Sequence, residues 1–204
     1  MGQYYTAVLI KDDKNGEGHA ECYSTWKANA GAKLMEHAYY GVPYADAVCA
    51  QLRRPTYEYN GDSFEPSRFA VVGDYYGDWD GFDALDEEYK LLCQVVWSRW
   101  GDALEKPLQV RQSPWRTYGG ECSIYMLNST KHECIKVEPD DIVNQEINPL
   151  FLLCAVGNGC GGGDYHGSDE DLCGSWAFDM VEIAELKEPP MGYKELRYDF
   201  AEEC

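Results

Sequence analysis

Residues 150–183 constrain the fold of this chain more than any other stretch, because two apolar segments flank a loop with five glycines in seven residues. Residues 150–156 form an apolar run that is too short for an independent helix and ends at glycine, as a buried strand ends at a turn. Residues 176–183 alternate well enough between apolar and polar side chains to predict a strand with one buried face. The stretch is therefore predicted to fold as a strand, a glycine-rich loop and a second strand.

The glycine-rich loop is the first candidate binding site. Glycine lacks a Cβ atom, so this backbone can adopt positive φ and approach a ligand closely. The carboxylates that follow offer hard oxygen ligands for a divalent cation, although their spacing does not match an EF-hand and a solvated acidic loop is the simpler alternative. The predicted ligand-binding residues are Gly157, Gly159, Gly161, Gly162, Gly163, Asp164 and His166, and the predicted metal ligands are Asp164, Asp169 and Asp171.

Enzymatic interpretations of this loop are less favoured. Residues 157–162 match G-x-G-x-x-G, but an acidic segment follows where a phosphate-binding loop needs a helix N-terminus. Cys160 has His166 nearby, yet the surrounding carboxylates oppose formation of a thiolate. The histidines and cysteines do not have the paired spacing of a zinc site. A non-enzymatic protein is therefore preferred, with no cofactor unless the loop holds a divalent cation.

The net charge of −19 limits the partners of this protein. Residues 121–204 carry 18 acids against 5 bases, and no Lys or Arg lies between Lys136 and Lys187. Such a surface repels nucleic-acid phosphates and anionic membranes and attracts basic protein surfaces. We therefore expect no direct binding to nucleic acid or membrane.

A second acidic segment supplies the candidate partner-binding surface. Seven acids and no base fall between Asp74 and Glu88. The last of these acids suit the amino end of a helix whose apolar stripe spans residues 85–100, where the helix dipole favours anions. The earlier acids stand among aromatic residues and are not explained in this way. The predicted partner-binding residues are Asp74, Tyr75, Tyr76, Asp78, Trp79 and Asp80.

The remaining patterns predict an α+β fold, with an antiparallel or mixed sheet of about six strands flanked by two main helices. Strands are expected at residues 4–10 and 68–73, in a hairpin at 122–137, and at the edge formed by the tail. A short helix should begin at Pro43 and stop before Pro55. The chain is expected to form one domain over residues 1–204. Two related lobes, about 1–105 and 118–204, are the alternative.

Cysteine usage and the amino terminus suggest a cytoplasmic protein. The nine cysteines include no C-x-x-C pair, and the chain shows neither a signal-peptide pattern nor an apolar run long enough to span a membrane. We therefore expect reduced thiols, several of them packed as small apolar side chains.

Several motifs resemble those of a family of hypothetical proteins encoded by bacteria and their phages. They are the opening Met1-Gly-Gln-Tyr-Tyr5, the run Lys33-Leu-Met-Glu-His37, Val72-Gly-Asp-Tyr75, the loop Gly157-Asn-Gly-Cys-Gly-Gly-Gly-Asp164 and Gly174-Ser-Trp176. The resemblance implies a phage or bacterial setting and assigns no activity.

Two functions from different classes follow. The first is an acidic interaction protein that occupies a basic nucleic-acid-binding groove on a host protein, as a phage-encoded inhibitor of a defence enzyme such as a CRISPR effector would, and acts in the host cytoplasm. The second is a ligand-binding or hydrolytic protein that holds a divalent cation or a small molecule at residues 157–171.

Overall fold

The structure is a computed structural model that describes residues 4–11, 19–23, 33–55, 66–73, 113–118, 121–157 and 165–201. Within these ranges the chain forms one mixed sheet with helices packed against it, which confirms the predicted α+β class. The strands are β1 (Tyr5–Lys11), β2 (His19–Tyr23), β3 (Ser67–Gly73), β4 (Ser123–Asn128), β5 (Glu133–Val137), β6 (Ala155–Val156), β7 (Met180–Leu186) and β8 (Lys194–Glu195). The helices are α1 (Leu34–His37), α2 (Pro43–Leu52), α4 (Pro139–Asn144) and α5 (Pro149–Leu153), with a 3-10 turn, η3, at Glu170–Leu172.

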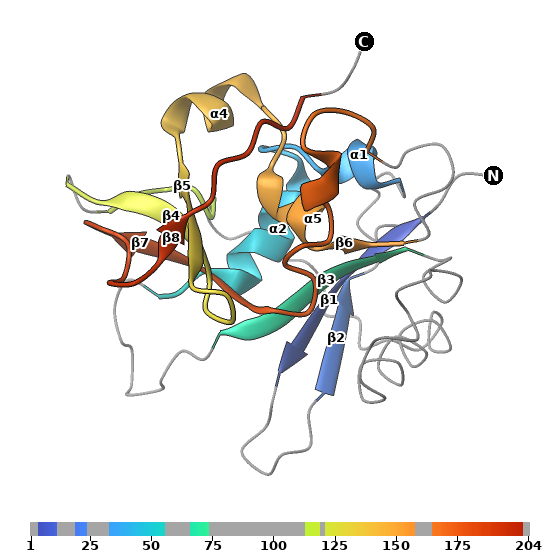
Figure 1. The fold of residues 1–204 in the computed structure, drawn as a ribbon, viewed down its shortest axis with the longest axis horizontal. Coiled ribbons are helices and arrows are strands. Elements are labelled where there is room, and N and C mark those ends of the chain that lie inside the picture. Colours follow the sequence, from blue (N-terminus) through green and yellow to red (C-terminus); the bar gives the residue numbers. More distant parts are fainter. Residues whose placement is uncertain are drawn as a thin grey trace.

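The sheet follows the order β2-β1-β3-β7-β4-β5-β8, with β6 beside β3 (Figure 1). Most neighbouring strands are antiparallel, whereas β6 runs parallel to β3 and β8 runs parallel to β5. Strand β7 joins the two parts of the sheet, because Met180 and Val181 pair with β3 and Val181 to Leu186 pair with β4. The six longer strands match the predicted number, and the two-residue strands β6 and β8 bring the described total to eight.

Helix α2 has the boundaries that its sequence predicts. Pro43 occupies the first turn, where its missing N–H costs no hydrogen bond, and the helix ends at Leu52. Arg53, which caps the helix, is already extended, and Pro55 disfavours helical backbone at Arg54, so the helix does not continue. The apolar residues of α2 are buried in the core, so packing rather than helix propensity stabilises this ten-residue helix.

The predicted hairpin at residues 122–137 is also confirmed. Strands β4 and β5 pair in antiparallel register from Ile124 opposite Val137 to Asn128 opposite Glu133. His132 closes the connection with a φ of 55°, a left-handed conformation that few residues other than glycine adopt.

The predicted strand at residues 150–156 is wrong over most of its length. Pro149–Leu153 forms α5, and only Ala155 and Val156 form a strand. The Asn148 side chain caps the helix by accepting a hydrogen bond from Leu150 N at 3.1 Å. Every residue of α5 is buried, so the segment has no polar face that would reveal helical periodicity.

The strand predicted at residues 176–183 begins later than expected. Trp176 to Asp179 form turns, Phe178 has a φ of 62°, and the strand covers Met180–Leu186. The tail contributes β8 at the sheet edge but only over two residues. The following residues, 196–201, continue with alternating partly buried and exposed side chains. We call residues 196–201 the C-terminal segment.

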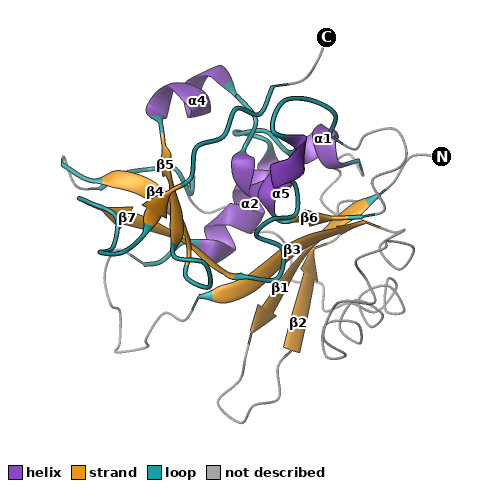
Figure 2. Cartoon of the chain, in the orientation of Figure 1, coloured by secondary structure: helices purple, strands orange, loops and turns teal. Residues whose placement is uncertain are grey.

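Helices α1, α2 and α5 gather on one side of β1 and β3, and α4 stands apart beyond the end of β5 (Figure 2). One buried apolar cluster contains Leu9 of β1, Val48 of α2, Phe69 of β3, Met126 of β4 and Phe151 of α5. The sheet and this cluster therefore draw residues from both of the ranges considered as separate lobes.

Two predicted features fall outside the described residues: the apolar helical stripe at 85–100 and the acidic, aromatic residues at 74–80. In the part of the chain that the structure describes, no helix is long and apolar enough to cross a membrane.

Candidate functional site

The strands that precede the glycine-rich loop and the predicted partner-binding segment lie side by side in the sheet. Val156 of β6 lies opposite Val72 of β3 in a parallel pair, so Gly157 and Gly73 follow at neighbouring strand ends. The loop residues Gly159, Gly161, Gly162, Gly163 and Asp164 lie outside the described residues, as do Asp74, Tyr75, Tyr76, Asp78, Trp79 and Asp80. Ligand binding by the loop and partner binding by residues 74–80 therefore stay predictions.

The described residues after the loop hold the C-terminal segment. Asp169 Oδ2 accepts a hydrogen bond from Asp199 N at 2.6 Å, and Ser168 N donates to Ala201 O at 3.3 Å. Tyr165 Oη accepts from Ala201 N at 3.0 Å and lies 2.9 Å from Ala201 O. A Cβ atom on Gly167 would stand 2.0 Å from Ala201 O, so only glycine fits there. This acidic stretch thus fastens the C-terminal segment to the body of the protein.

The metal prediction has little support among these residues. Asp169 Oδ2 already accepts a hydrogen bond from the Asp199 backbone N–H. Asp171 is exposed on the 3-10 turn η3. His166 Nδ1 lies 3.6 Å from Glu170 Oε1, with both side chains exposed. Within the described ranges, no group of three or more His, Cys, Asp or Glu residues could hold a metal ion. The third predicted ligand, Asp164, lies outside those ranges, so the metal site stays a prediction.

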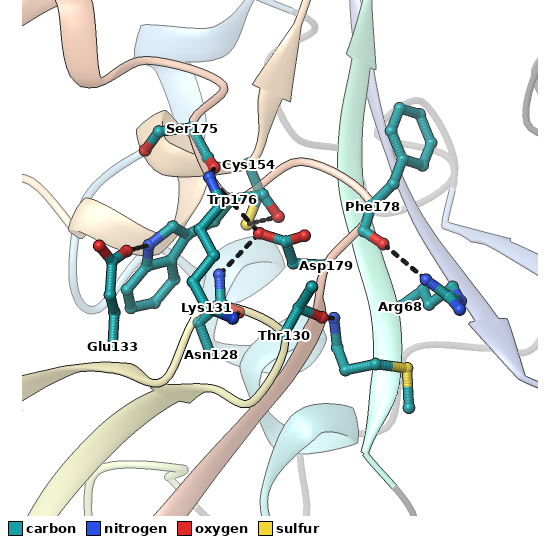
Figure 3. Close-up of polar contacts among 11 residues, drawn as sticks. Arg68, Asn128, Thr130, Lys131, Glu133, Cys154, Ser175, Trp176, Phe178 and Asp179 are labelled. Carbon is teal, nitrogen blue, oxygen red and sulfur yellow. Dashed lines mark hydrogen bonds and ion pairs between the residues drawn. The ribbon is translucent and has the colours of Figure 1, made fainter. Parts of the chain in front are cut away.

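A polar network lies where the β4–β5 turn meets the start of β7 (Figure 3). The buried Asn128 amide donates to Asp179 Oδ2 at 2.8 Å and accepts from Lys131 N at 3.0 Å. Lys131 Nζ lies 3.8 Å from Asp179 Oδ2 and donates to the Ser175 carbonyl. Thr130 Oγ1 accepts from Met180 N at 2.9 Å. These contacts clamp the hairpin turn onto the segment that leads into β7.

That segment, residues 174–179, is also fixed from the other side. Trp176 N donates to Leu153 O at 2.7 Å, and the buried Trp176 ring donates from Nε1 to Glu133 Oε2 at 2.7 Å. Phe178 N donates to Phe69 O at 2.8 Å, and the Arg68 guanidinium approaches Phe178 O at 3.5 Å (Figure 3). Buried side-chain hydrogen bonds of this kind specify one arrangement of the chain. The network therefore has a structural role.

The same network lacks the arrangement that hydroxyl-based catalysis needs. A serine nucleophile requires a general base within hydrogen-bond distance. Ser175 Oγ is buried with no hydrogen-bond partner among the described residues. The nearby Lys131 ammonium is engaged by the Ser175 carbonyl and by Asp179. No nucleophile and base are paired among the described residues of this network.

Three of the described thiols, those of Cys49, Cys154 and Cys173, are unsuited to nucleophilic attack, which requires the thiolate. Burial raises the pKa of Cys49 and of Cys154 far above the ordinary range. Burial, and then Glu170 and Asp171, raise the pKa of Cys173 to about 12. These cysteines remain protonated at neutral pH. Cys160, the partner considered for His166, lies outside the described residues.

Two arginines after α2 bind carboxylates of β7. Arg54 donates from Nε and Nη2 to the two oxygens of Glu182 at 2.9 and 2.6 Å, a bidentate pair. Arg53 Nη2 lies 3.0 Å from Glu185 Oε2. Glu182 is only 3% exposed, so the guanidinium offsets the free energy of burying its charge. These acids therefore stabilise the fold and are not available to a partner.

Other acids remain on the surface, grouped around α4. None of the helix residues is buried, and Val143 is 78% exposed. Lys136 Nζ binds Glu138 Oε1 at 2.9 Å, and no other described Lys or Arg forms an ion pair with the acids of this group. Burial, and then repulsion from its acidic neighbours, raise the pKa of Asp141. We call this surface the α4–tail face; it comprises Glu138, Asp140, Asp141, Val143, Glu146 and, from the C-terminal segment, Tyr198.

No helix is predicted from the sequence at residues 139–144, where the structure has α4. The signal for a helix was present, because Pro139 is followed by two aspartates, which favour a first helical turn. The exposure of the helix has no sequence signal of its own, since it depends on where α4 stands relative to the sheet (Figure 1).

In comparisons with known proteins, no protein-family model, no curated protein and no solved structure matches the chain.

Proposed function

We propose that this protein is a non-enzymatic interaction protein whose acidic surface occupies the basic, nucleic-acid-binding surface of another protein. The observation that carries the proposal is the uncompensated acidity of the surface between Lys136 and Lys187. Eleven acids and no bases lie between these two lysines. Of the described acids, Asp179, Glu182 and Glu185 pair with bases from elsewhere in the chain. The carboxylates of the α4–tail face keep most of their charge unpaired.

The net charge and the family resemblance together indicate the kind of partner. A protein with a net charge of −19 is drawn quickly to a cationic groove, and this steering weakens as salt screens it. The resemblance to proteins of bacteria and their phages favours a host enzyme that handles nucleic acid, including a defence nuclease. We place the interaction in the host cytoplasm. We propose inhibition by occupancy of the partner's groove rather than by catalysis.

The test is capture of partners from bacterial lysate on the tagged protein, with elution by rising salt. Recovery of a nucleic-acid enzyme that elutes as salt rises is the expected result. Native mass spectrometry of the purified protein is the companion measurement. A stoichiometric ion or small molecule on an otherwise unpartnered chain would contradict the proposal and direct attention to residues 157–171.

A further inference from the structure

Strand β8 has an edge that no described strand pairs with. It is the last strand in the order of the sheet, next to β5. The N–H groups of Lys194 and Leu196 donate to carbonyls on the β5 side, each at 2.8 Å. Successive residues of an extended strand point their N–H and C=O groups to opposite edges, as the ladder pattern requires. The backbone groups of Glu195 therefore point away from β5, toward the outer edge.

The C-terminal segment continues from β8 in the same extended pattern (Figure 1). The even-numbered side chains from 196 to 200 pack partly buried against the core, and the odd-numbered ones from 197 to 201 are exposed. This period of two is that of a strand. From residue 199 onward the outer edge is closed, because the N–H groups of residues 199 and 201 bind the Asp169 and Tyr165 side chains. The open stretch of the edge is therefore residues 195–197.

The described part of the chain leaves this open stretch unoccupied. Neither Glu195 N nor Arg197 N makes a hydrogen bond to a described residue, and neither side chain forms an ion pair there. Both side chains are exposed and lie on the same face of the strand, two positions apart, with opposite charges. An unpaired strand edge is a template for another strand, and charges that lie directly opposite each other decide which pairing is favourable.

The charges of this stretch select one register for pairing with a second copy of itself. When a strand pairs antiparallel with its own copy about a twofold axis, the residue on the axis fixes every other pair. An axis at Lys194, Glu195 or Arg197 would set two like charges directly opposite each other. An axis at Leu196 instead sets Glu195 opposite Arg197 of the second copy. Both of these residues present the outward backbone groups that an antiparallel pair exchanges.

We propose that two copies of this protein associate through the open edge of β8, with residues 195–197 of each copy paired antiparallel about a twofold axis at Leu196. Each Glu195 binds Arg197 of the second copy, and the two sheets join into one. The contact is short, because the edge is closed from Asp199 onward, and the net charge of −19 on each copy opposes association. The dimer is therefore weak and forms at high protein concentration. It does not depend on the proposed function.

The test is sedimentation velocity of the full chain over a series of protein concentrations, at about 0.15 M salt to screen the repulsion between copies. The unmodified chain should shift from monomer to dimer as its concentration rises. Glu195→Arg and Arg197→Glu should each weaken dimerisation about tenfold or more, because each replaces both attractive cross-strand pairs with repulsive ones. The double variant, Glu195→Arg with Arg197→Glu, restores opposite charges and should return dimerisation to within about twofold of the unmodified chain.

Glu188→Arg is the matched control, because Glu188 is exposed between β7 and β8 and the variant makes the same change in net charge as Glu195→Arg. It lowers the negative charge of the chain and should leave dimerisation equal or slightly stronger. If Glu195→Arg strengthens dimerisation as Glu188→Arg does, net charge alone governs association, and the register is overturned.

Three other results would also overturn the proposal. They are a monomer at every concentration, a dimer that all these variants leave unchanged, and a double variant that fails to recover. A lysate protein that binds the unmodified chain and is lost with Arg197→Glu would show that the edge receives a strand of a different protein instead. A failed dimer leaves the proposed function standing, because capture of a nucleic-acid enzyme by the acidic surface does not require this edge.

Discussion

Replacing Gly167 by alanine should release the C-terminal segment. The new Cβ atom would stand 2.0 Å from Ala201 O and 2.7 Å from Tyr165 Oη, and backbone atoms cannot yield by that much without breaking their contacts. Three hydrogen bonds join Ala201 to Tyr165 and Ser168. Each of these hydrogen bonds contributes about 1 kcal/mol, and the edge-on contact of Tyr165 with Phe200 contributes about 1 kcal/mol more. The released segment regains conformational entropy, which offsets part of this loss. We therefore expect a net destabilisation of about 2–3 kcal/mol.

Urea unfolding of Gly167→Ala measures the loss of unfolding free energy. Trypsin cleavage after the exposed Arg197, which lies within the C-terminal segment, should become faster if the segment is released. Gly192→Ala is the control. Gly192 has a φ of 90°, but a Cβ atom added to it would meet nothing within 4 Å, so alanine should cost only about 1 kcal/mol of backbone strain and leave cleavage at Arg197 unchanged. A change in unfolding free energy below about 0.5 kcal/mol for Gly167→Ala, with unaltered cleavage, would refute the reasoning.

Three further predictions concern buried groups. Arg54→Met should destabilise the protein by about 1–3 kcal/mol in urea at neutral pH, because it leaves the Glu182 carboxylate buried without its cation; an unchanged midpoint would contradict the pairing. Because the pKa of Tyr198 is raised from 10.0 to about 12, its stabilising effect is complete below pH 10 and is lost as the pH rises toward 12; alkaline urea titration of Tyr198→Phe should show a smaller fall over that window than the unmodified chain. Cys154 should react with a thiol reagent only on unfolding, and rapid labelling in the native state, identified by mass spectrometry, would contradict its burial.

The parts of the fold that could be predicted have local signals. Pro43 and Pro55 mark both ends of α2, and the apolar strands on either side of a polar turn define the β4–β5 hairpin. Helix α5 was missed because five buried residues show no periodicity, although Asn148 and Pro149 form a legible helix start.

The contacts that build the candidate surfaces are long-range, and no local pattern encodes them. The Tyr198 region was predicted as part of an edge strand, yet Asp199 N binds the Asp169 side chain instead of a neighbouring strand. The pairing of Arg54 with Glu182 spans 128 residues of sequence. The total charge follows from the composition. The tertiary structure decides which acids form ion pairs and which remain exposed around α4.

Competition with DNA for a captured partner tests the central claim most directly. A fluorescent DNA is bound to the partner, and this protein is added at increasing concentration and at several salt concentrations. We predict that the protein displaces the DNA, and that displacement weakens as salt rises, because the same basic groove receives phosphates or carboxylates. A ternary complex in which the DNA stays bound, or displacement that is indifferent to salt, would contradict the account.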